Sequence, residues 1–174
     1  MALKGFIELL RLERLAESRK SEIQPKPAEQ WQGIAFEVAG EKFVAPIGEV
    51  AEVISVPEAL TPVPLSKPWL LGIANIRGQL LPIADLAKFV NLNNKTQQSK
   101  LMVIKHHNLQ VGLMVDEVWH IKNFFAHQYV AKSLVTNSPF LPYNHGRFED
   151  SEQSWPIFMP SLLIQDPRFL QVAQ

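Results

Sequence analysis

The chain has 174 residues, of which 17 are basic, 17 are acidic and none is cysteine. A formal net charge of zero gives no overall attraction to nucleic acid or anionic lipid. The lack of cysteine excludes disulfides, thiolate nucleophiles and cysteine-ligated metal sites. No stretch approaches the roughly 18 apolar residues of a membrane span, so we expect no nucleic-acid partner and no direct insertion into a membrane.

The first 30 residues are expected to form a helix and a linker. The helix has an apolar stripe at the spacing i, i+3, i+4, i+7, made of Leu3, Phe6, Ile7 and Leu10. Residues 21–30 contain two prolines among polar residues, which is typical of a linker. Because the stripe is too apolar to be left in water, we expect the helix to dock on its own domain or on a partner.

The main domain, expected at 31–172, begins with short β runs. Residues 34–38 alternate apolar and polar, and a turn at 39–41 leads into a return strand at 43–47. Residues 47–54 carry apolar side chains at helical spacing, which predicts a short helix. Four prolines in the segment 57–68 then exclude regular structure and predict a stiff connection.

A hairpin is expected in the middle of the chain, where strands at 72–77 and 79–84 flank the turn Arg77-Gly78. Pro82 within the second run predicts a sheet edge, a bulge or a strand end. Asp85 is placed to cap a short helix that ends at Phe89.

The second half begins with a further pair of strands, at 101–105 and 111–115. Residues 137–153 are rich in Pro, Asn, Gly and acids and are predicted to be irregular, before a last strand at 155–159. The helical pattern at 161–172 contains a proline that should break it. A helix at each end with many short strands between favours small barrels over a doubly wound sheet.

The histidines give no metal-site spacing. His106 and His107 are adjacent at a strand end, where their side chains should point to opposite faces. His120 and His127 lack the i, i+4 spacing of a helical zinc site. The sequence therefore predicts no metal and no cofactor.

The most informative block is the hairpin at 69–86. Gly78 permits a positive φ at the chain reversal. Arg77 would then project five donors from a rigid turn, toward a partner's carboxylate or toward backbone carbonyls of its own barrel. The residues alone support these two interpretations equally.

Three blocks, in order, resemble the CheW-like chemotaxis coupling proteins: Phe43-Val-Ala-Pro-Ile-Gly-Glu-Val-Ala-Glu-Val53, Gly72-Ile-Ala-Asn-Ile-Arg-Gly-Gln-Leu-Leu-Pro-Ile-Ala-Asp-Leu86 and Val111-Gly-Leu-Met-Val-Asp-Glu-Val118. Together they cover roughly residues 31–122. The leading helix and Phe43-Val-Ala-Pro resemble, more narrowly, the CheW-like adaptor of the type IV pilus chemosensory system, which governs twitching motility. Departures are the N-terminal extension, Ala84 where a larger apolar residue is usual, and the polar segment 137–153.

The resemblance implies a mainly β fold of two SH3-like five-stranded barrels, with an N-terminal and a C-terminal helix. The first barrel is expected at roughly 34–92, the second at roughly 100–160, and the final helix at 161–172. It further implies a non-enzymatic cytoplasmic adaptor in receptor arrays at the inner membrane. Such adaptors bridge the cytoplasmic tips of methyl-accepting chemoreceptors and the regulatory domain of a CheA-type histidine kinase.

The resemblance also places the partner contacts. They fall at Val50 and Glu52 and, near the receptor-facing groove, at Gly72, Asn75, Arg77 and Gly78. Arg77 and Glu52 are the strongest candidates because charged residues are seldom needed for packing. Val50 has an equally good interpretation as a core residue.

Two other functions stay open at this point. One is an SH3-like peptide-binding module unrelated to chemotaxis. The other is a small hydrolase with a site built from His145, Asp150 and Ser154, although the sequence shows neither an oxyanion hole nor a base near the nucleophile. An OB-fold nucleic-acid binder is disfavoured by the neutral charge.

Overall fold

The computed structural model describes residues 5, 7–8, 29–93, 97–131 and 137–174. Of the expected N-terminal helix and linker, Gly5, Ile7 and Glu8 are helical. The other residues of the segment 1–28 lie outside the described part of the chain.

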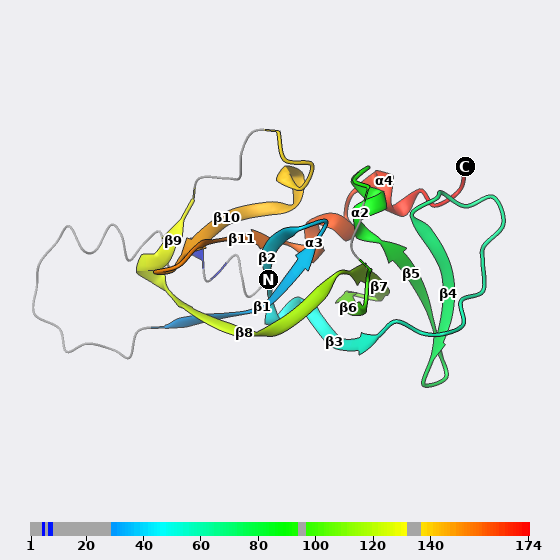
Figure 1. The fold of residues 1–174 in the computed structure, drawn as a ribbon, viewed down its shortest axis with the longest axis horizontal. Coiled ribbons are helices and arrows are strands. Elements are labelled where there is room, and N and C mark those ends of the chain that lie inside the picture. The colour runs from blue at the N-terminus through cyan, green and yellow to red at the C-terminus, as the bar shows by residue number, and fades with distance from the viewer. Residues whose placement is uncertain (1–4, 6, 9–28, 94–96, 132–136) are drawn as a thin grey trace, which may run out of the picture.

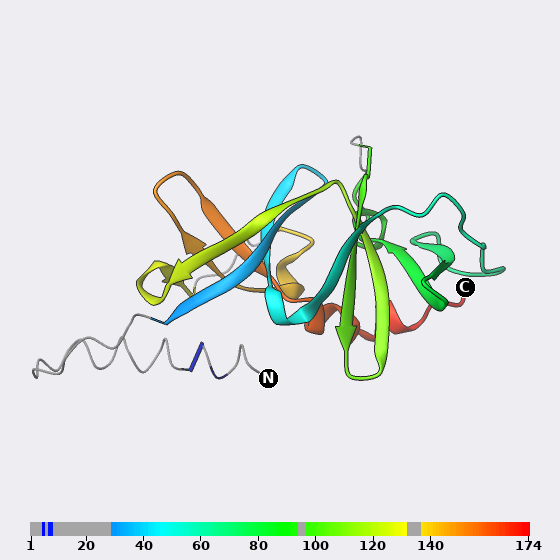
Figure 2. The same ribbon diagram turned by 90° about the horizontal axis from the view of Figure 1, so that it is seen from below.

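Two β-sheets lie side by side (Figures 1 and 2). The first has six strands in the order β8-β1-β2-β11-β10-β9. Neighbouring strands are antiparallel except β2 and β11, which are parallel. The strands are β1 (Gln30–Val38), β2 (Glu41–Pro46), β8 (Glu117–Phe125), β9 (Tyr129–Val130), β10 (Asn144–Glu149) and β11 (Ser154–Phe158).

The second sheet has five strands in the order β3-β6-β7-β5-β4. Only β5 and β7 pair in parallel, and they do so from Ile83 onward. Pro82 lies in the middle of β5, opposite Ile73 of β4 and one residue before this ladder, so it occupies a stretch where β5 pairs with β4 alone, the edge setting that was one of the predicted alternatives. The strands are β3 (Val50–Ser55), β4 (Leu70–Ile76), β5 (Gln79–Asp85), β6 (Lys100–His106) and β7 (Leu109–Val115).

The expected fold class, mainly β with two small subdomains, is confirmed, but the expected division at 34–92 and 100–160 does not match the sheets. The chain leaves the first sheet after β2, forms β3–β7 in the second sheet, and returns at β8. Alternation of apolar and polar residues identifies a strand without telling which strand lies beside it. This is why a division by chain order failed.

The helices are short and lie at connections. They are η1 (Ile47–Glu49), α2 (Leu86–Phe89), η2 (Ala126–Gln128), η3 (Leu141–Tyr143), α3 (Pro160–Ile164) and α4 (Pro167–Leu170). Asp85 caps α2 by accepting from the Lys88 N–H at 3.1 Å, as expected. The break at Pro167 is also confirmed, because the helix expected at 161–172 is two short helices.

Two local expectations were wrong. The helix predicted over 47–54 is a single 3-10 turn followed by β3, in which Val50, Glu52 and Ile54 are more buried than the residues between them. The segment 137–153, predicted to be irregular, contains β10, where Phe148 is buried. In both cases pairing with another strand, β6 for β3 and β11 for β10, overrides a weak local pattern.

One core lies between the two sheets and holds them together. Phe36 and Phe43 of the first sheet share it with Met102 and Leu113 of the second, and Phe158 closes it. A separate core within the first sheet contains Trp31, Phe124, Phe148, Trp155 and also Ile7, whose exposed fraction is 6%. The described part of the N-terminal helix therefore packs on its own domain.

Candidate functional site

The turn between β4 and β5 is a tight two-residue reversal. Arg77 has φ +50° and Gly78 has φ +83°, the pair of positive values that a type I′ turn requires. The side-chain oxygen of Asn75, two residues before Arg77, accepts the Gly78 N–H at 2.9 Å and so braces the turn. Asn-Gly is the favoured pair in such turns, so arginine at the first position costs conformational energy. The turn therefore presents Arg77 from a rigid support.

Arg77 and Glu52, far apart in the sequence, form an ion pair. Arg77 Nη1 lies 2.9 Å from Glu52 Oε2, with the two side chains 76% and 32% exposed. Glu52 lies on β3 and Arg77 at the end of β4, and these strands are the opposite edges of the five-stranded sheet. The ion pair thus lies across a small hollow that Leu81 and Val103 help to line. Both candidates stay accessible.

The other sequence candidates separate into two groups. Asn75 and Gly78 are exposed parts of the turn. Val50 is 8% exposed and belongs to the core between the sheets. Gly72 is buried with φ +148°, and a Cβ there would lie 2.5 Å from the carbonyl oxygen of Thr61. The lack of a side chain at Gly72 lets the proline-rich segment pair with β4, so Gly72 has a structural role inside the domain.

An apolar surface, which we call the hairpin face, adjoins the turn and was missed by the sequence analysis. Leu80 is 75% exposed, Leu109 51% and Leu170 53%. A groove that includes Leu109 and Leu170 runs past Pro82 to the C-terminal helices and is lined by Trp69, Leu70, Pro82, Leu109, Gln110, Val111, Ile164, Phe169, Leu170 and Val172. Because Leu80 and Leu81 are both apolar, alternation alone could not tell which of them points outward.

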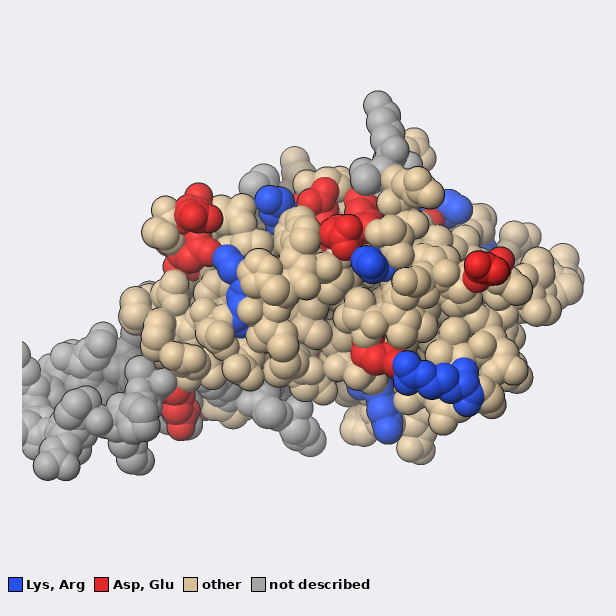
Figure 3. Space-filling view, turned by 60° about the horizontal axis from the view of Figure 1, so that its bottom comes forward, with Lys and Arg blue, Asp and Glu red and all other residues tan. Residues whose placement is uncertain are grey.

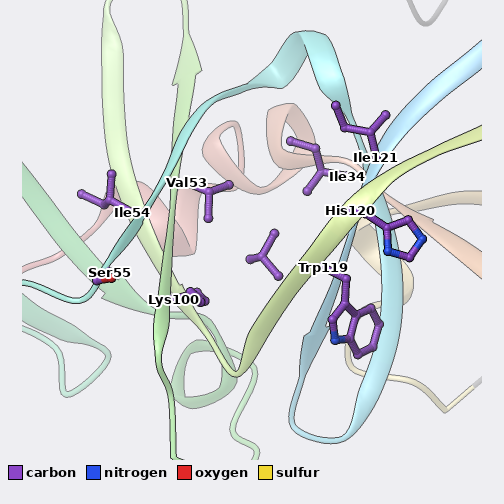
Figure 4. A pocket seen from close by; sticks show the side chains of 9 residues that line it. Ile34, Val53, Ile54, Ser55, Lys100, Trp119, His120 and Ile121 are labelled. Carbon is purple, nitrogen blue, oxygen red and sulfur yellow. The ribbon is translucent and has the colours of Figure 1, made fainter.

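A second groove, the inter-sheet groove, separates β3 from β8 (Figure 4). Each of these strands is the outer strand of its sheet. Figure 4 shows Val53 and Ile54 on one side and Ile34, Trp119 and Ile121 on the other. The remaining lining residues are Ser55, Lys100, Val118 and His120.

The β8 wall of the inter-sheet groove carries exposed apolar side chains on a fixed support. Ile121 is 49% exposed and Trp119 is 37% exposed. The Trp119 ring lies edge-on to Trp155 at 6.2 Å, and Lys42 Nζ lies 5.0 Å from its centroid. An apolar surface held in one orientation favours docking, since little side-chain freedom is lost on binding.

Charge is distributed in small mixed groups. The face in Figure 3 shows acidic and basic side chains interspersed, with uncharged residues covering most of it. No extended basic patch is visible on that face, in line with the neutral composition. This face therefore offers no continuous basic surface of the kind that binds a polyanion.

The carboxylate of Asp150 is fully engaged in structural contacts. It accepts from Lys122 Nζ at 2.7 Å, from Trp155 Nε1 at 2.7 Å, and from the backbone N–H groups that follow it. The hydrogen bond from Lys122 is the main reason that the pKa of Asp150 lies well below its usual range. This bonding closes the β10–β11 hairpin and does not form the triad with His145 and Ser154.

His106 and His107 do not point to opposite faces, contrary to expectation. His107 lies in the β6–β7 turn with φ +52°, which brings the two ring centroids to 4.3 Å. Within residues 29–93, 97–131 and 137–174, no group of three or more His, Asp or Glu side chains is arranged to hold a metal ion.

A family comparison explains why these features occur together. The CheW-like domain model matches residues 32–166, most of the chain. The chain belongs to the CheW-like family. It is 38% identical over 152 residues to Protein PilI of Pseudomonas aeruginosa, covering 86% of this chain and 84% of that protein. It is 28% identical to Chemotaxis protein CheW of Thermotoga maritima, covering 51% of this chain and 59% of that protein.

The fold comparison agrees with this CheW-like assignment. The crystal structure of the scaffolding protein TtCheW from Thermoanaerobacter tengcongensis superposes with a TM-score of 0.65 at 22% identity, covering 75% of this chain and 89% of that one. Among the helices in the described residues, none is long and apolar enough to cross a membrane.

Proposed function

We propose that this CheW-like protein is a non-enzymatic adaptor that couples chemoreceptors to a CheA-type histidine kinase in cytoplasmic arrays at the inner membrane. One observation carries the proposal: β3 contributes to two separate surfaces, the hollow under the Glu52–Arg77 pair and the inter-sheet groove. Glu52 faces Arg77 and the hairpin, whereas its neighbour Val53 faces the inter-sheet groove. A bridge between two partners needs two surfaces on one rigid body, and the common core supplies that rigidity.

We assign the β4–β5 hairpin, with Arg77 and the adjoining hairpin face, to the kinase regulatory domain. The resemblance placed this turn near the receptor-facing groove, but the channel suited to a helical receptor tip is the inter-sheet groove. Arg77 in the turn and Leu80 on β5 are 76% and 75% exposed. An arginine beside an apolar patch is a frequent energetic centre of protein interfaces. The regulatory domain is expected to have the same barrel fold, so two barrels would meet here.

The inter-sheet groove is the proposed contact for the receptor tip. Its apolar walls come from two edge strands and leave a channel rather than a flat surface. An amphipathic helix binds such a groove with residues at i, i+3, i+4 and i+7. A helix of the receptor tip would bury Val53, Ile121 and Trp119, which are 38%, 49% and 37% exposed in the free protein.

The array served is proposed to be the one that controls type IV pilus twitching motility. The support is the identity with Protein PilI, which extends over most of both chains, whereas the match to Chemotaxis protein CheW of Thermotoga maritima covers about half of this chain. A deletion strain assayed for twitching and for swimming chemotaxis separates the two pathways. Loss of swimming chemotaxis with normal twitching would contradict the pilus assignment.

Two surface variants test the adaptor proposal. Leu80→Ser should weaken titration calorimetry with the kinase regulatory domain and leave receptor-tip binding unchanged. Val53→Asp should do the opposite, because a carboxylate in the groove would be desolvated by the bound helix. Both side chains are substantially exposed, so folding should change little. If wild type gives no heat with either partner at about 100 μM, the protein is not this adaptor, since even a Kd of roughly 1 mM corresponds to about −4 kcal/mol.

A further inference from the structure

The start of β3 is tied to a helix that lies more than a hundred residues further along the chain. Glu49 accepts the Ser161 N–H at 2.8 Å through Oε2 and the Ser161 hydroxyl at 3.0 Å through Oε1, across a separation of 112 residues. Both carboxylate oxygens are therefore used on one residue of the first turn of α3.

This contact completes a helix that lacks a local cap. Met159 occupies the N-cap position of α3 and makes no side-chain capping bond, and Pro160 follows it. The Ser161 N–H is one of the amides that a helix leaves unsatisfied at its start, and a carboxylate there is also favoured by the helix dipole. Glu49, although distant in the sequence, thus provides the capping acceptor that the residues next to α3 lack.

The same contact fixes where β3 begins. Glu49 is the last residue of η1, the three-residue passage from the first sheet to the second, and Val50 starts β3. The pairing of β3 with β6 then shifts register between Val50 and Glu52, which leaves Ala51 as a bulge. A bulge re-aims the side chains that follow it, and the first of them is Glu52.

We infer that Glu49 is a positioning residue for the partner-binding surface. Anchored on Ser161, it holds the bulged start of β3 so that Glu52 reaches Arg77 at 2.9 Å. The anchor joins α3, which follows the first sheet, to the edge of the second sheet. This inference rests on the proposed function, because its consequence is the affinity for the kinase regulatory domain.

A double-mutant cycle distinguishes positioning from simple stabilisation. Glu49→Ala should weaken binding of the regulatory domain about five-fold, the effect of a modest coupling. In a chain that already carries Glu52→Ala, the same substitution should weaken binding no further, since Glu49 acts through Glu52. The conservative variant Glu49→Gln keeps one acceptor oxygen for Ser161 and should recover most of the affinity. Glu149→Ala, which removes an exposed ion pair with Arg147 on β10, is the matched control and should bind as wild type.

Every outcome of the double-mutant cycle either supports or overturns the positioning role of Glu49. If Glu49→Ala lowers the melting temperature but binds as wild type, Glu49 only stabilises the fold and the inference is wrong. If its effect on binding multiplies with that of Glu52→Ala, the two residues act independently and the inference is wrong as well. Should Glu49→Ala fail to fold, Glu49→Gln carries the same cycle. No binding by wild type would overturn the proposed function together with this inference, whereas the other failures leave the adaptor proposal intact.

Discussion

Arg77→Asn separates the function of the hairpin turn from its stability. Arginine at φ +50° costs about 1 kcal/mol relative to a residue suited to the left-handed region. Asparagine is favoured at this position of a type I′ turn and relieves that cost. The substitution also removes the ion pair with Glu52, but the arginine side chain is 76% exposed, and such pairs contribute about 0–1 kcal/mol after solvent screening.

The two effects on stability should nearly cancel. We expect the free energy of unfolding to stay within about 1 kcal/mol of wild type, which corresponds to a melting temperature within roughly 2–4 °C for a domain of this size. Binding should respond differently, because an arginine at the centre of an interface is commonly worth about 2 kcal/mol or more. That loss is an approximately 30-fold increase in Kd for the kinase regulatory domain.

The assay combines thermal melting with titration calorimetry on the same preparations. Arg147→Asn is the matched control, since its guanidinium pairs with Glu149 on β10, away from the hairpin. A fall in stability of about 2 kcal/mol or more for Arg77→Asn would show that the ion pair is structural. A variant that melts and binds like wild type would remove Arg77 from the binding surface.

Three further predictions concern the scaffold. Ile7→Ala should lower the melting temperature, because truncating a buried isoleucine costs about 2 kcal/mol or more. Glu8→Ala, on the exposed side of the same helix, should leave the melting temperature unchanged. Equal melting temperatures for the two variants would mean that the helix does not pack on the domain. Gly72→Ala should destabilise far more than Gly78→Ala in urea titrations, because only at Gly72 would the new Cβ meet a backbone carbonyl; equal losses would refute that steric argument. The hydrogen bond from Arg168 lowers the pKa of Asp166 to about 2. The folded chain therefore binds fewer protons at Asp166 than the unfolded chain does. The resulting contribution to stability is present above about pH 4 and is lost as the pH falls toward about 2. Asp166→Asn should therefore flatten the acid limb of stability measured against pH, and an unchanged limb would contradict the assignment.

The hairpin was predictable because its signals are local. A Gly at a two-residue reversal, flanked by apolar runs, determines a turn within a few residues, and β4 and β5 appeared where expected. Asp85 as a cap and the break at Pro167 are likewise decided by their immediate neighbours. The positions of Arg77 and Asn75 on an exposed turn follow from the same local logic.

What the sequence did not predict depends on distant pairing. The return of the chain to the first sheet at β8, the inter-sheet groove, and the ion pair of Glu52 with Arg77 all require knowing which strands are neighbours. The resemblance implied partner contacts at both Val50 and Glu52. In the structure Val50 is buried in the core between the sheets, whereas Glu52 is partly exposed and pairs with Arg77. Glu49 and Ser161 are joined over 112 residues, and neither carries a signal of that contact in its own surroundings.

The adaptor function is tested most directly by asking whether this protein bridges its two partners. Receptor cytoplasmic tips are immobilised, and the CheA-type kinase is added with and without the protein. We predict that this protein increases kinase retention on the tips and that Val53→Asp and Leu80→Ser each abolish that increase. Val53→Asp should lose binding to the receptor, and Leu80→Ser should lose binding to the kinase. Kinase retention that is the same with and without the protein, under conditions where each partner alone is active, would contradict the adaptor function.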